Sequence, residues 1–153
     1  MKIIIGSDAF GFSLKEAVKE TLAAKGYHIE DTTPEPVFYA DAAKKVAAGV
    51  QSGAFPRGIV FCGTGMGVSI IANKHRGVYA ALCESVYQAQ RAKAVNNTNV
   101  LCLGGMIIGA EMGSAMALAW LEAEHLQDMD EATAKRVKEE SQALLDFDND
   151  AFI

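Results

Sequence analysis

The feature that most constrains this chain is a short apolar run that leads into a cysteine and a glycine-rich loop, within the segment GIVFCGTGMGVSIIANK at residues 58–74. The run consists of Ile59, Val60 and Phe61 and lies between turn-forming residues. A continuous apolar run of this length is typical of a strand that is buried on both faces, as in a parallel sheet. The residues that follow the loop are apolar and compatible with a helix. We therefore predict a buried strand, a tight loop and a helix, in that order.

The loop itself has a composition that suits chemistry on an anion. Glycines at Gly63, Gly65 and Gly67 let the backbone turn sharply and bring its N–H groups close to a ligand, and the next helix adds unpaired donors. Cys62 stands at the strand end, where the same groups would stabilise a thiolate. A cysteine alone would more simply be a small buried hydrophobe. Together with three glycines at a strand end, it favours a catalytic interpretation.

The rest of the chain alternates between strand-like and helix-like segments. Strands are predicted at 2–6, 27–31, 59–61, 78–82 and 99–103. Helices are predicted from Ser13 to Gly26, from Tyr39 to Ser52, from the glycine loop through Lys74, from Ser85 to Ala94 and from Gly109 to His125. The first helix is expected to start at a capping box formed by Ser13 and Glu16. This alternation predicts an α/β sandwich of the Rossmann-like (flavodoxin-like) class, with a five-stranded parallel sheet and helices on both faces.

Ligands of such sheets bind beyond the carboxyl ends of the strands. Three residues with reactive or polar side chains fall at these predicted ends, namely Asp8, Cys62 and Glu84. Because parallel strands end at the same edge, we expect these side chains on the same side of the molecule.

Length and charge narrow the functional classes. With 153 residues, residues 1–153 are predicted to form one domain. A formal net charge of −5 gives no electrostatic support for nucleic-acid binding. No transmembrane segment or secretory signature is apparent, so no membrane partner is expected. The three cysteines are an odd number without C-x-x-C spacing, which favours a reduced, cytoplasmic protein with no metal site.

The C-terminal segment, 128–153, differs from the remainder. It carries a weak apolar stripe at helical spacing with charged residues beside it and an acidic end. A sheet with five strands is already covered, so we predict that this extra C-terminal helix and tail pack at a subunit interface. The alternative is a solvated helix that covers its own domain.

The glycine loop does not match the common nucleotide-binding motifs. The sixth position of a dinucleotide fingerprint would be glycine, but here it is Val68, and the loop follows the third strand rather than the first. Glu84 does lie about 20 residues further on, where a ribose-binding acid would be expected. A nucleotide-binding regulator therefore stays an alternative, whereas no Gly-Lys-Ser/Thr ending of a P-loop is present.

Five motifs in order and in register resemble one known family. They are Gly6-Ser-Asp8, Cys62-Gly-Thr-Gly-Met-Gly67 leading to Ala72-Asn73-Lys74, Ala80-Ala-Leu82, Asn96-Asn97-Thr-Asn99-Val-Leu and Leu103-Gly-Gly-Met-Ile-Ile-Gly109. Together they resemble the ribose-5-phosphate isomerase B and galactose-6-phosphate isomerase family, from Met1 to about Glu124. The resemblance implies aldose–ketose isomerisation of a small sugar or sugar phosphate, without metal or cofactor. It also implies a homodimer or homotetramer with active sites shared across the interface.

The implied chemistry agrees with the residues of the loop. Isomerisation removes a proton from a carbon next to a carbonyl and passes through an enediolate, so it needs a base and donors for the developing oxyanion. By resemblance, Cys62 is the base, Thr64 the hydroxyl beside it and Asp8 a group that binds substrate hydroxyls. Backbone N–H groups of the loop would hold the enediolate oxygen. The expected substrate-binding residues are Ser7, Asp8, Tyr39, Gly63, Gly65, Met66, Gly67, Arg91, Asn96, Asn97 and Arg136, with Asn96 reaching in from the partner subunit.

Three positions depart from the family pattern. Ala9 and Val95 stand where the family usually has histidines, the second of which helps to open the sugar ring, and Met106 replaces a usual arginine. A C-terminal Arg-His-x-x-Arg cluster that binds phosphate is also missing, although Arg136 and Lys138 lie in that region. The groups for proton transfer are thus present, whereas those for ring opening and phosphate binding are lost or moved.

These departures favour a substrate that is already an open chain. A tetrose 4-phosphate fits, because a blocked C4 oxygen cannot close a five-membered ring, and a pentose phosphate is the other candidate. Arg91 and Lys93 precede Val95 on a predicted helix and are candidates to replace the lost phosphate contacts. The alternative is that each is a surface charge on an amphipathic helix. The alternatives are a non-phosphorylated or carboxylated sugar, or a non-catalytic subunit of a heteromeric isomerase.

Overall fold

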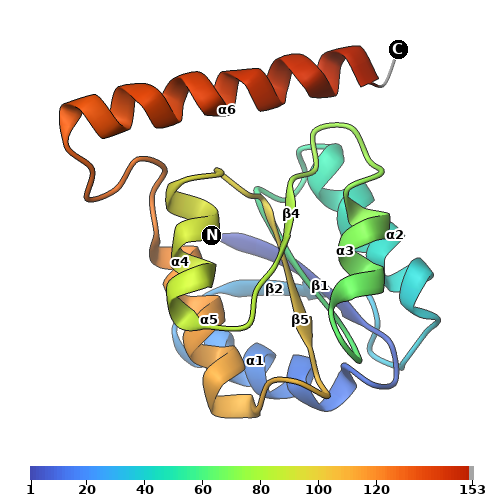
Figure 1. Cartoon of the computed structure of the whole chain (residues 1–153). Helices are drawn as coiled ribbons and strands as arrows, with labels where there is room; N and C mark the ends of the chain where they lie inside the picture. The colour runs from blue at the N-terminus through green and yellow to red at the C-terminus, as the bar shows by residue number, and fades with distance from the viewer. Residues whose placement is uncertain (152–153) are drawn as a thin grey trace.

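The computed structural model describes residues 1–151, and this part of the chain contains a five-stranded parallel sheet and six helices (Figure 1). The elements are β1 (Lys2–Ser7), α1 (Phe12–Ala24), β2 (His28–Asp31), α2 (Tyr39–Gln51), β3 (Arg57–Cys62), α3 (Met66–Ala72), β4 (Ala80–Leu82), α4 (Val86–Ala94), β5 (Val100–Gly104), α5 (Ala110–Glu122) and α6 (Glu131–Ala151). The predicted α/β sandwich with an extra C-terminal helix is confirmed.

The sheet has the strand order β2-β1-β3-β5-β4, with every neighbouring pair parallel. The flavodoxin order would place the fourth strand beside the third. Here β5 lies between β3 and β4, so that Cys62 at the end of β3 is paired with Gly104 at the end of β5. The two glycine-rich loops that follow these strands are therefore direct neighbours.

Helices cover both faces of the sheet, as Figure 1 shows. On one face α1, α4 and α5 pack over a core that includes Ile3, Phe61 and Trp120. On the other face α2 and α3 pack over Val60 and Val68. Since side chains alternate along a strand, a strand covered on both faces needs apolar residues at consecutive positions. All six residues of β3 are buried, which confirms the interpretation of its apolar run.

The edge strand β4 is only three residues long and is tied down by side-chain amides. Asn73 donates to the carbonyl oxygen of Ala80 at 2.9 Å and accepts from the N–H of the same residue at 2.9 Å. Asn99 accepts from the N–H of Tyr79 at 2.7 Å and donates to the carbonyl oxygen of Gly77 at 2.7 Å. Asn73 thus binds the first residue of β4 and Asn99 the segment before it, and the observed strand is shorter than the predicted 78–82.

The predicted capping box at Ser13 and Glu16 is wrong. Helix α1 begins one residue earlier, with Gly11 as its N-cap and no side-chain cap bond. The reason lies upstream, because Asp8 Oδ1 accepts the N–H groups of Phe10 and Gly11 at 2.9 Å each and turns the chain into the helix before Ser13 is reached. Glu16 instead forms ion pairs within the same helix.

Helix α6 lies across the amino-terminal end of the sheet (Figure 1). Its described residues bury only Val137. Near its end, Asp148 Oδ2 accepts from the N–H of Gly77 at 2.8 Å and from the hydroxyl of Tyr79 at 3.2 Å. None of the helices in residues 1–151 combines the length and the apolar character needed to cross a bilayer. The predicted subunit interface at 128–153 stays a prediction, and its residues 152 and 153 lie outside the described residues.

Candidate active site

An open pocket of about 290 Å³ lies beyond the carboxyl ends of β1 and β3. Most of the residues that line it were expected from the sequence: Asp8, Tyr39, Cys62, Gly63, Thr64 and Gly67, together with Phe10. They come from three segments far apart in the chain, and the parallel arrangement of β1 and β3 brings the first and third of these together.

Cys62 is the last residue of β3, and the residue is only 5% exposed. Its Sγ accepts a hydrogen bond from the N–H of Gly65 at 3.1 Å. This contact requires the left-handed backbone of Gly65, at φ +78°, which is the N-cap of α3. Among the described residues, the N–H groups of Gly63 and Thr64 donate to no acceptor. The loop thus places one donor on the sulfur and leaves two more free beside it.

The loop after β5 holds the Cys62 loop in place. The N–H of Gly105 donates to the carbonyl oxygen of Cys62 at 2.8 Å, and the N–H of Met106 donates to that of Gly63 at 2.9 Å. The two backbones approach so closely that a Cβ on Gly104 would lie 2.6 Å from the carbonyl carbon of Thr64. These contacts hold the backbone of Cys62 and Gly63, and so orient the free N–H groups of Gly63 and Thr64 in the pocket wall.

Three polar side chains line the same pocket as the cysteine. Asp8 is half-buried, and its Oδ1 is occupied by backbone N–H groups, which leaves Oδ2 for a ligand. Thr64 is exposed, and its Oγ1 accepts the N–H of Met66 at 3.4 Å. Tyr39 packs its ring on Gly67, where a Cβ would lie 2.8 Å from the ring carbon Cε2. The pocket therefore offers a sulfur, a carboxylate and two hydroxyls to a small polyol.

Ser7 occupies a different environment from the one expected. Its side chain is fully buried, and its Oγ has no hydrogen-bond partner among residues 1–151. Its backbone N–H donates to Thr33 Oγ1 at 2.8 Å. The hydroxyl of Ser7 does not reach the pocket surface, so any role of this residue in the site passes through its backbone.

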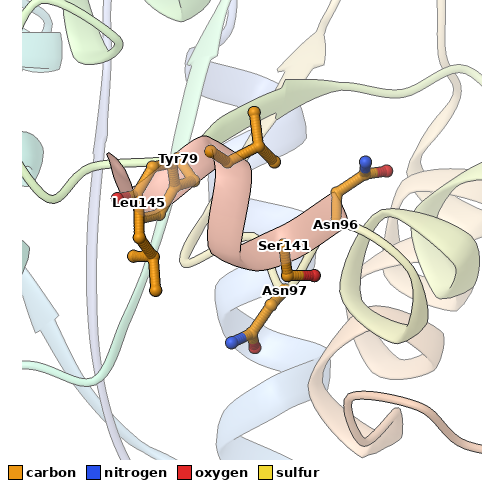
Figure 2. Close-up of a pocket in the computed structure, with 6 residues that line it drawn as sticks. Tyr79, Asn96, Asn97, Ser141 and Leu145 are labelled. Atoms are coloured by element: carbon orange, nitrogen blue, oxygen red, sulfur yellow. The ribbon is translucent and has the colours of Figure 1, made fainter. Parts of the chain in front are cut away.

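Four of the predicted residues lie at the opposite end of the sheet. Asn96 and Asn97 precede β5 and line a groove against Ser141 and Leu145 of α6 (Figure 2). The start of β5 is paired with Gly58 and its end with Cys62, so about 13 Å of strand separates the two ends. Arg91 on α4 and Arg136 on α6 belong to this side, and Arg136 is paired with Glu140 at 3.0 Å. Within one chain these residues are not brought to Cys62.

Two apolar residues at the pocket mouth were not predicted to be part of the site. Phe10 is 67% exposed and Met106 70% exposed, and both flank Gly63, where a Cβ would lie 3.4 Å and 3.1 Å from them. The signals in the sequence were a large apolar residue two positions after Asp8 and a methionine at a usual arginine position. No lysine or arginine is among the residues that line the pocket within the described chain.

The nucleotide-binding alternative loses its geometric basis. Glu84 follows β4 at the sheet edge, and β5 separates that strand from β3. Its N–H donates to the side-chain oxygen of Gln88, on the helix α4 that follows. A ribose-binding acid would need to stand at the end of the strand next to the glycine loop.

The other two cysteines are poorly suited to proton transfer. Burial raises the pKa of Cys83 to about 11, and that of Cys102 well above its ordinary value, with Cys62 and Cys83 adding to the second shift. Both are also buried in the core. No group of three or more His, Cys, Asp or Glu side chains suited to a metal ion is found in residues 1–151.

The chain is similar in sequence to proteins of one known family. A family model described as Ribose/Galactose Isomerase matches residues 3–139. The chain is 47% identical over 137 residues to a 4-deoxy-4-sulfo-D-erythrose isomerase from Clostridium sp. strain MSTE9, covering 86% of this chain and 85% of that one. It is 39% identical over 128 residues to a D-erythrulose-4-phosphate isomerase from Pectobacterium atrosepticum, covering 81% and 84%.

A solved structure agrees in shape as well as in sequence. Ribose-5-phosphate isomerase B from Mycoplasma genitalium with bound ribulose-5-phosphate matches with a TM-score of 0.86 and 30% identity, covering 97% of this chain and 96% of that one. The family model covers most of the chain and these relatives agree with it, so the chain belongs to the ribose/galactose isomerase family.

Proposed function

We propose that this chain interconverts an aldose and a ketose that have four carbons and an anionic group on C4, with Cys62 as the base. The contact that carries the proposal is the hydrogen bond from Gly65 N–H to Cys62 Sγ at 3.1 Å, in a pocket that also contains Asp8 and Thr64. A donor aimed at the sulfur favours negative charge there, which a proton-abstracting thiolate requires.

The reaction would proceed by two proton shifts. Cys62 Sγ removes the proton from C2 of the aldose, and the electron pair forms the C1–C2 double bond of an enediolate. Returning that proton to C1, and moving the hydroxyl proton from O2 to O1, gives the ketose. The free N–H groups of Gly63 and Thr64 would stabilise the enediolate oxygen. Thr64 Oγ1 and Asp8 Oδ2 would bind and exchange the hydroxyl protons.

The size of the substrate follows from what the site lacks. Val95 stands where family members usually have the histidine that opens a sugar ring. A four-carbon sugar with a phosphate ester or a sulfonate on C4 has no C4 hydroxyl, so it cannot close a furanose ring. The two relatives named above are a 4-deoxy-4-sulfo-D-erythrose isomerase and a D-erythrulose-4-phosphate isomerase, which supports a four-carbon substrate.

The substrate's terminal anion needs a cation that one chain does not provide in its own pocket. We propose that a homodimer or homotetramer supplies it, with Asn96, Arg91 and Arg136 of one protomer facing the Cys62 site of its partner. The position of these residues at the far end of the sheet supports this arrangement, because they cannot serve their own site. Segment 128–153 would then lie at the interface.

A panel of five sugars tests the proposal: 4-deoxy-4-sulfo-erythrose, erythrose 4-phosphate, ribose 5-phosphate, galactose 6-phosphate and unmodified erythrose. We expect the two C4-anionic tetroses to have the highest kcat/KM. The sulfonate should be favoured, because it carries a single negative charge whereas a phosphate carries about −1.5 to −2, and few cations are available. In heavy water, deuterium should appear on C1 of the ketose.

Two outcomes of this assay would contradict different parts of the proposal. Equal turnover of unmodified erythrose would remove the anionic group from the proposal and leave the isomerase. Turnover of none of the five sugars by a folded oligomer would contradict the isomerase function itself, and would favour a non-catalytic subunit.

A further inference from the structure

A fully buried lysine lies outside the pocket and has no part in the proton transfers described above. Lys15 on α1 has 0% exposure. Its Nζ is 2.8 Å and 3.0 Å from the two carboxylate oxygens of Asp31, 3.0 Å from Glu16 Oε1 and 2.6 Å from the carbonyl oxygen of Thr33. Burying an ammonium group costs several kcal/mol unless its contacts offset the loss of water. The four contacts of Lys15 Nζ are the groups that offset this cost.

The charges of the cluster are balanced. Lys19 binds the same two acids, at 2.8 Å from Asp31 Oδ2 and 2.7 Å from Glu16 Oε1. Burial alone would raise the pKa of Asp31, but hydrogen bonds from Lys15 and Lys19 hold it below its ordinary value. Both lysines therefore bind Asp31 Oδ2 and Glu16 Oε1. Lys15 alone also binds Asp31 Oδ1 and the carbonyl oxygen of Thr33, and its Nζ lies 4.5 Å from the centroid of the Phe12 ring.

Thr33 connects this cluster to the end of β1. Its own side chain is buried, its N–H donates to Asp31 Oδ1 at 3.0 Å, and its Oγ1 accepts the N–H of Ser7 at 2.8 Å. The pairing of β1 with β2 ends at Ile5 and Asp31, so the hydroxyl of Thr33 takes the place of the next strand partner for Ser7.

Ser7 is the residue before Asp8, whose carboxylate enters the pocket. On one side this strand end is held by β3, through the pairing of Ser7 with Phe61 and the bond from Asp8 N–H to the Phe61 carbonyl oxygen at 3.3 Å. On the other side, the hydroxyl of Thr33 accepts the hydrogen bond that joins this strand end to the residues after β2. Because Asp8 Oδ1 is fixed to backbone N–H groups, the direction of Oδ2 follows the backbone of residues 7–11.

We propose that Lys15 and Thr33 are positioning residues of the active site, which act through Ser7 to fix the carboxylate of Asp8. Neither touches the pocket. The proposal rests on the proposed function, because its kinetic effect requires that Asp8 bind the substrate.

The chain offers matched variants for the test. Lys15→Met and Lys19→Met each remove one lysine from the same two carboxylates, but only the first breaks the contact with Thr33. Thr33→Val removes the acceptor of Ser7 N–H and leaves the ion cluster intact, whereas Thr33→Ser keeps a hydroxyl. We expect kcat/KM to fall about 10- to 100-fold in Lys15→Met and Thr33→Val, as for a small misplacement of a catalytic group. Lys19→Met and Thr33→Ser should stay within about 2-fold of wild type.

A double-mutant cycle separates positioning from general loss of stability. In an Asp8→Asn background, Thr33→Val should lower kcat/KM by less than about 2-fold, because its effect passes through the Asp8 carboxylate. If the full loss persists in that background, the network does not act on Asp8 and the proposal is wrong. Should Lys15→Met fail to fold, the Thr33 variants decide, since they leave every charge in place.

Amide hydrogen exchange gives a readout that does not depend on turnover. Without substrate, Thr33→Val and Lys15→Met should speed exchange at the N–H groups of Ser7, Phe10 and Gly11, while Lys19→Met should not. A wild-type protein that converts no sugar would overturn the proposed function, and the exchange pattern would still decide whether the network fixes Asp8. Unchanged exchange at all three amides in Thr33→Val would overturn the inference.

Discussion

Replacing Gly65 by alanine tests whether the shape of the cysteine loop controls both stability and turnover. Gly65 has φ +78°, a conformation that costs a residue with a Cβ about 1 to 2 kcal/mol. Its Cβ would also lie 2.5 Å from Leu82 Cδ1 and 3.1 Å from the carbonyl carbon of Leu103. Leu82 Cδ1 is the end of a half-buried side chain and can shift, whereas the Leu103 backbone belongs to the buried strand β5, between β3 and β4, and cannot.

The chain contains a control that isolates the backbone cost. Gly53 has φ +75°, and a Cβ there would meet nothing within 4 Å. Gly53→Ala should therefore lower the free energy of unfolding by about 1 to 2 kcal/mol, from backbone strain alone. Overpacking adds about 1 to 3 kcal/mol, so Gly65→Ala should lose about 2 to 5 kcal/mol. At about 2 to 4 °C per kcal/mol for a chain of this size, the difference is readily measured.

Urea denaturation and steady-state turnover, performed on both variants, complete the test. Gly53→Ala should have wild-type kcat, whereas Gly65→Ala should lose at least about 10-fold, because its N–H is displaced from Cys62 Sγ. The turnover of Gly65→Ala is to be measured well below its own unfolding temperature. If the two variants were equally stable and equally active, the contact between Gly65 and Cys62 would have no role in either property.

Three further predictions concern the cysteine, the acid cluster and the assembly. Cys62→Ser should lower kcat by about 100- to 10,000-fold with a much smaller change in substrate binding, because a hydroxyl is a far weaker acid than a thiol, while Cys83→Ser should show its cost mainly in the urea midpoint. The folded-state pKa values of Glu16 and Asp31 lie below their ordinary values of 4.5 and 3.8. Their ion pairs therefore stabilise the fold above about pH 5, and this stabilisation is lost as the pH falls and the two carboxylates become protonated. Urea midpoints should decline from pH 6 to pH 3, and less steeply in Lys19→Met. Mixing inactive Cys62→Ser with inactive Asn96→Ala should restore about a quarter of wild-type activity through hybrid dimers with one intact site, and no recovery after verified subunit exchange would contradict shared sites.

The part of the fold that could be predicted from the sequence is the part that depends on local pattern. The unbroken apolar run before Cys62 marks a strand covered on both faces, and parallel strands place Asp8 and Cys62 at one edge without further information. The glycines of the loop likewise report a close approach of backbones, which the structure locates between Gly65 and the end of β5.

The features that could not be predicted depend on packing between distant segments. Nothing in residues 78–104 indicates that β5 lies between β3 and β4, because both strands are short and apolar. Lys15 resembles a solvent-exposed helix residue until β2 brings Asp31 beside it. The prediction of a capping box at Ser13 was wrong for a similar reason. The carboxylate of Asp8 binds the N–H groups of Phe10 and Gly11, so the helix begins before Ser13.

The insertion of β5 also has a consequence for the order in which the molecule is completed. β4 precedes β5 in the chain but has no neighbour in the sheet until residues 100–104 are in place. During synthesis from the N-terminus, β1, β2 and β3 can pair while the free edge of β3 stays open to any other strand. The same late segment donates the N–H groups of Gly105 and Met106 to the cysteine loop. The nascent chain therefore carries Cys62 on a loop without its last restraints until about two-thirds of the residues have been made. The wall of the pocket around Cys62 is complete only once β5 has been added to the sheet.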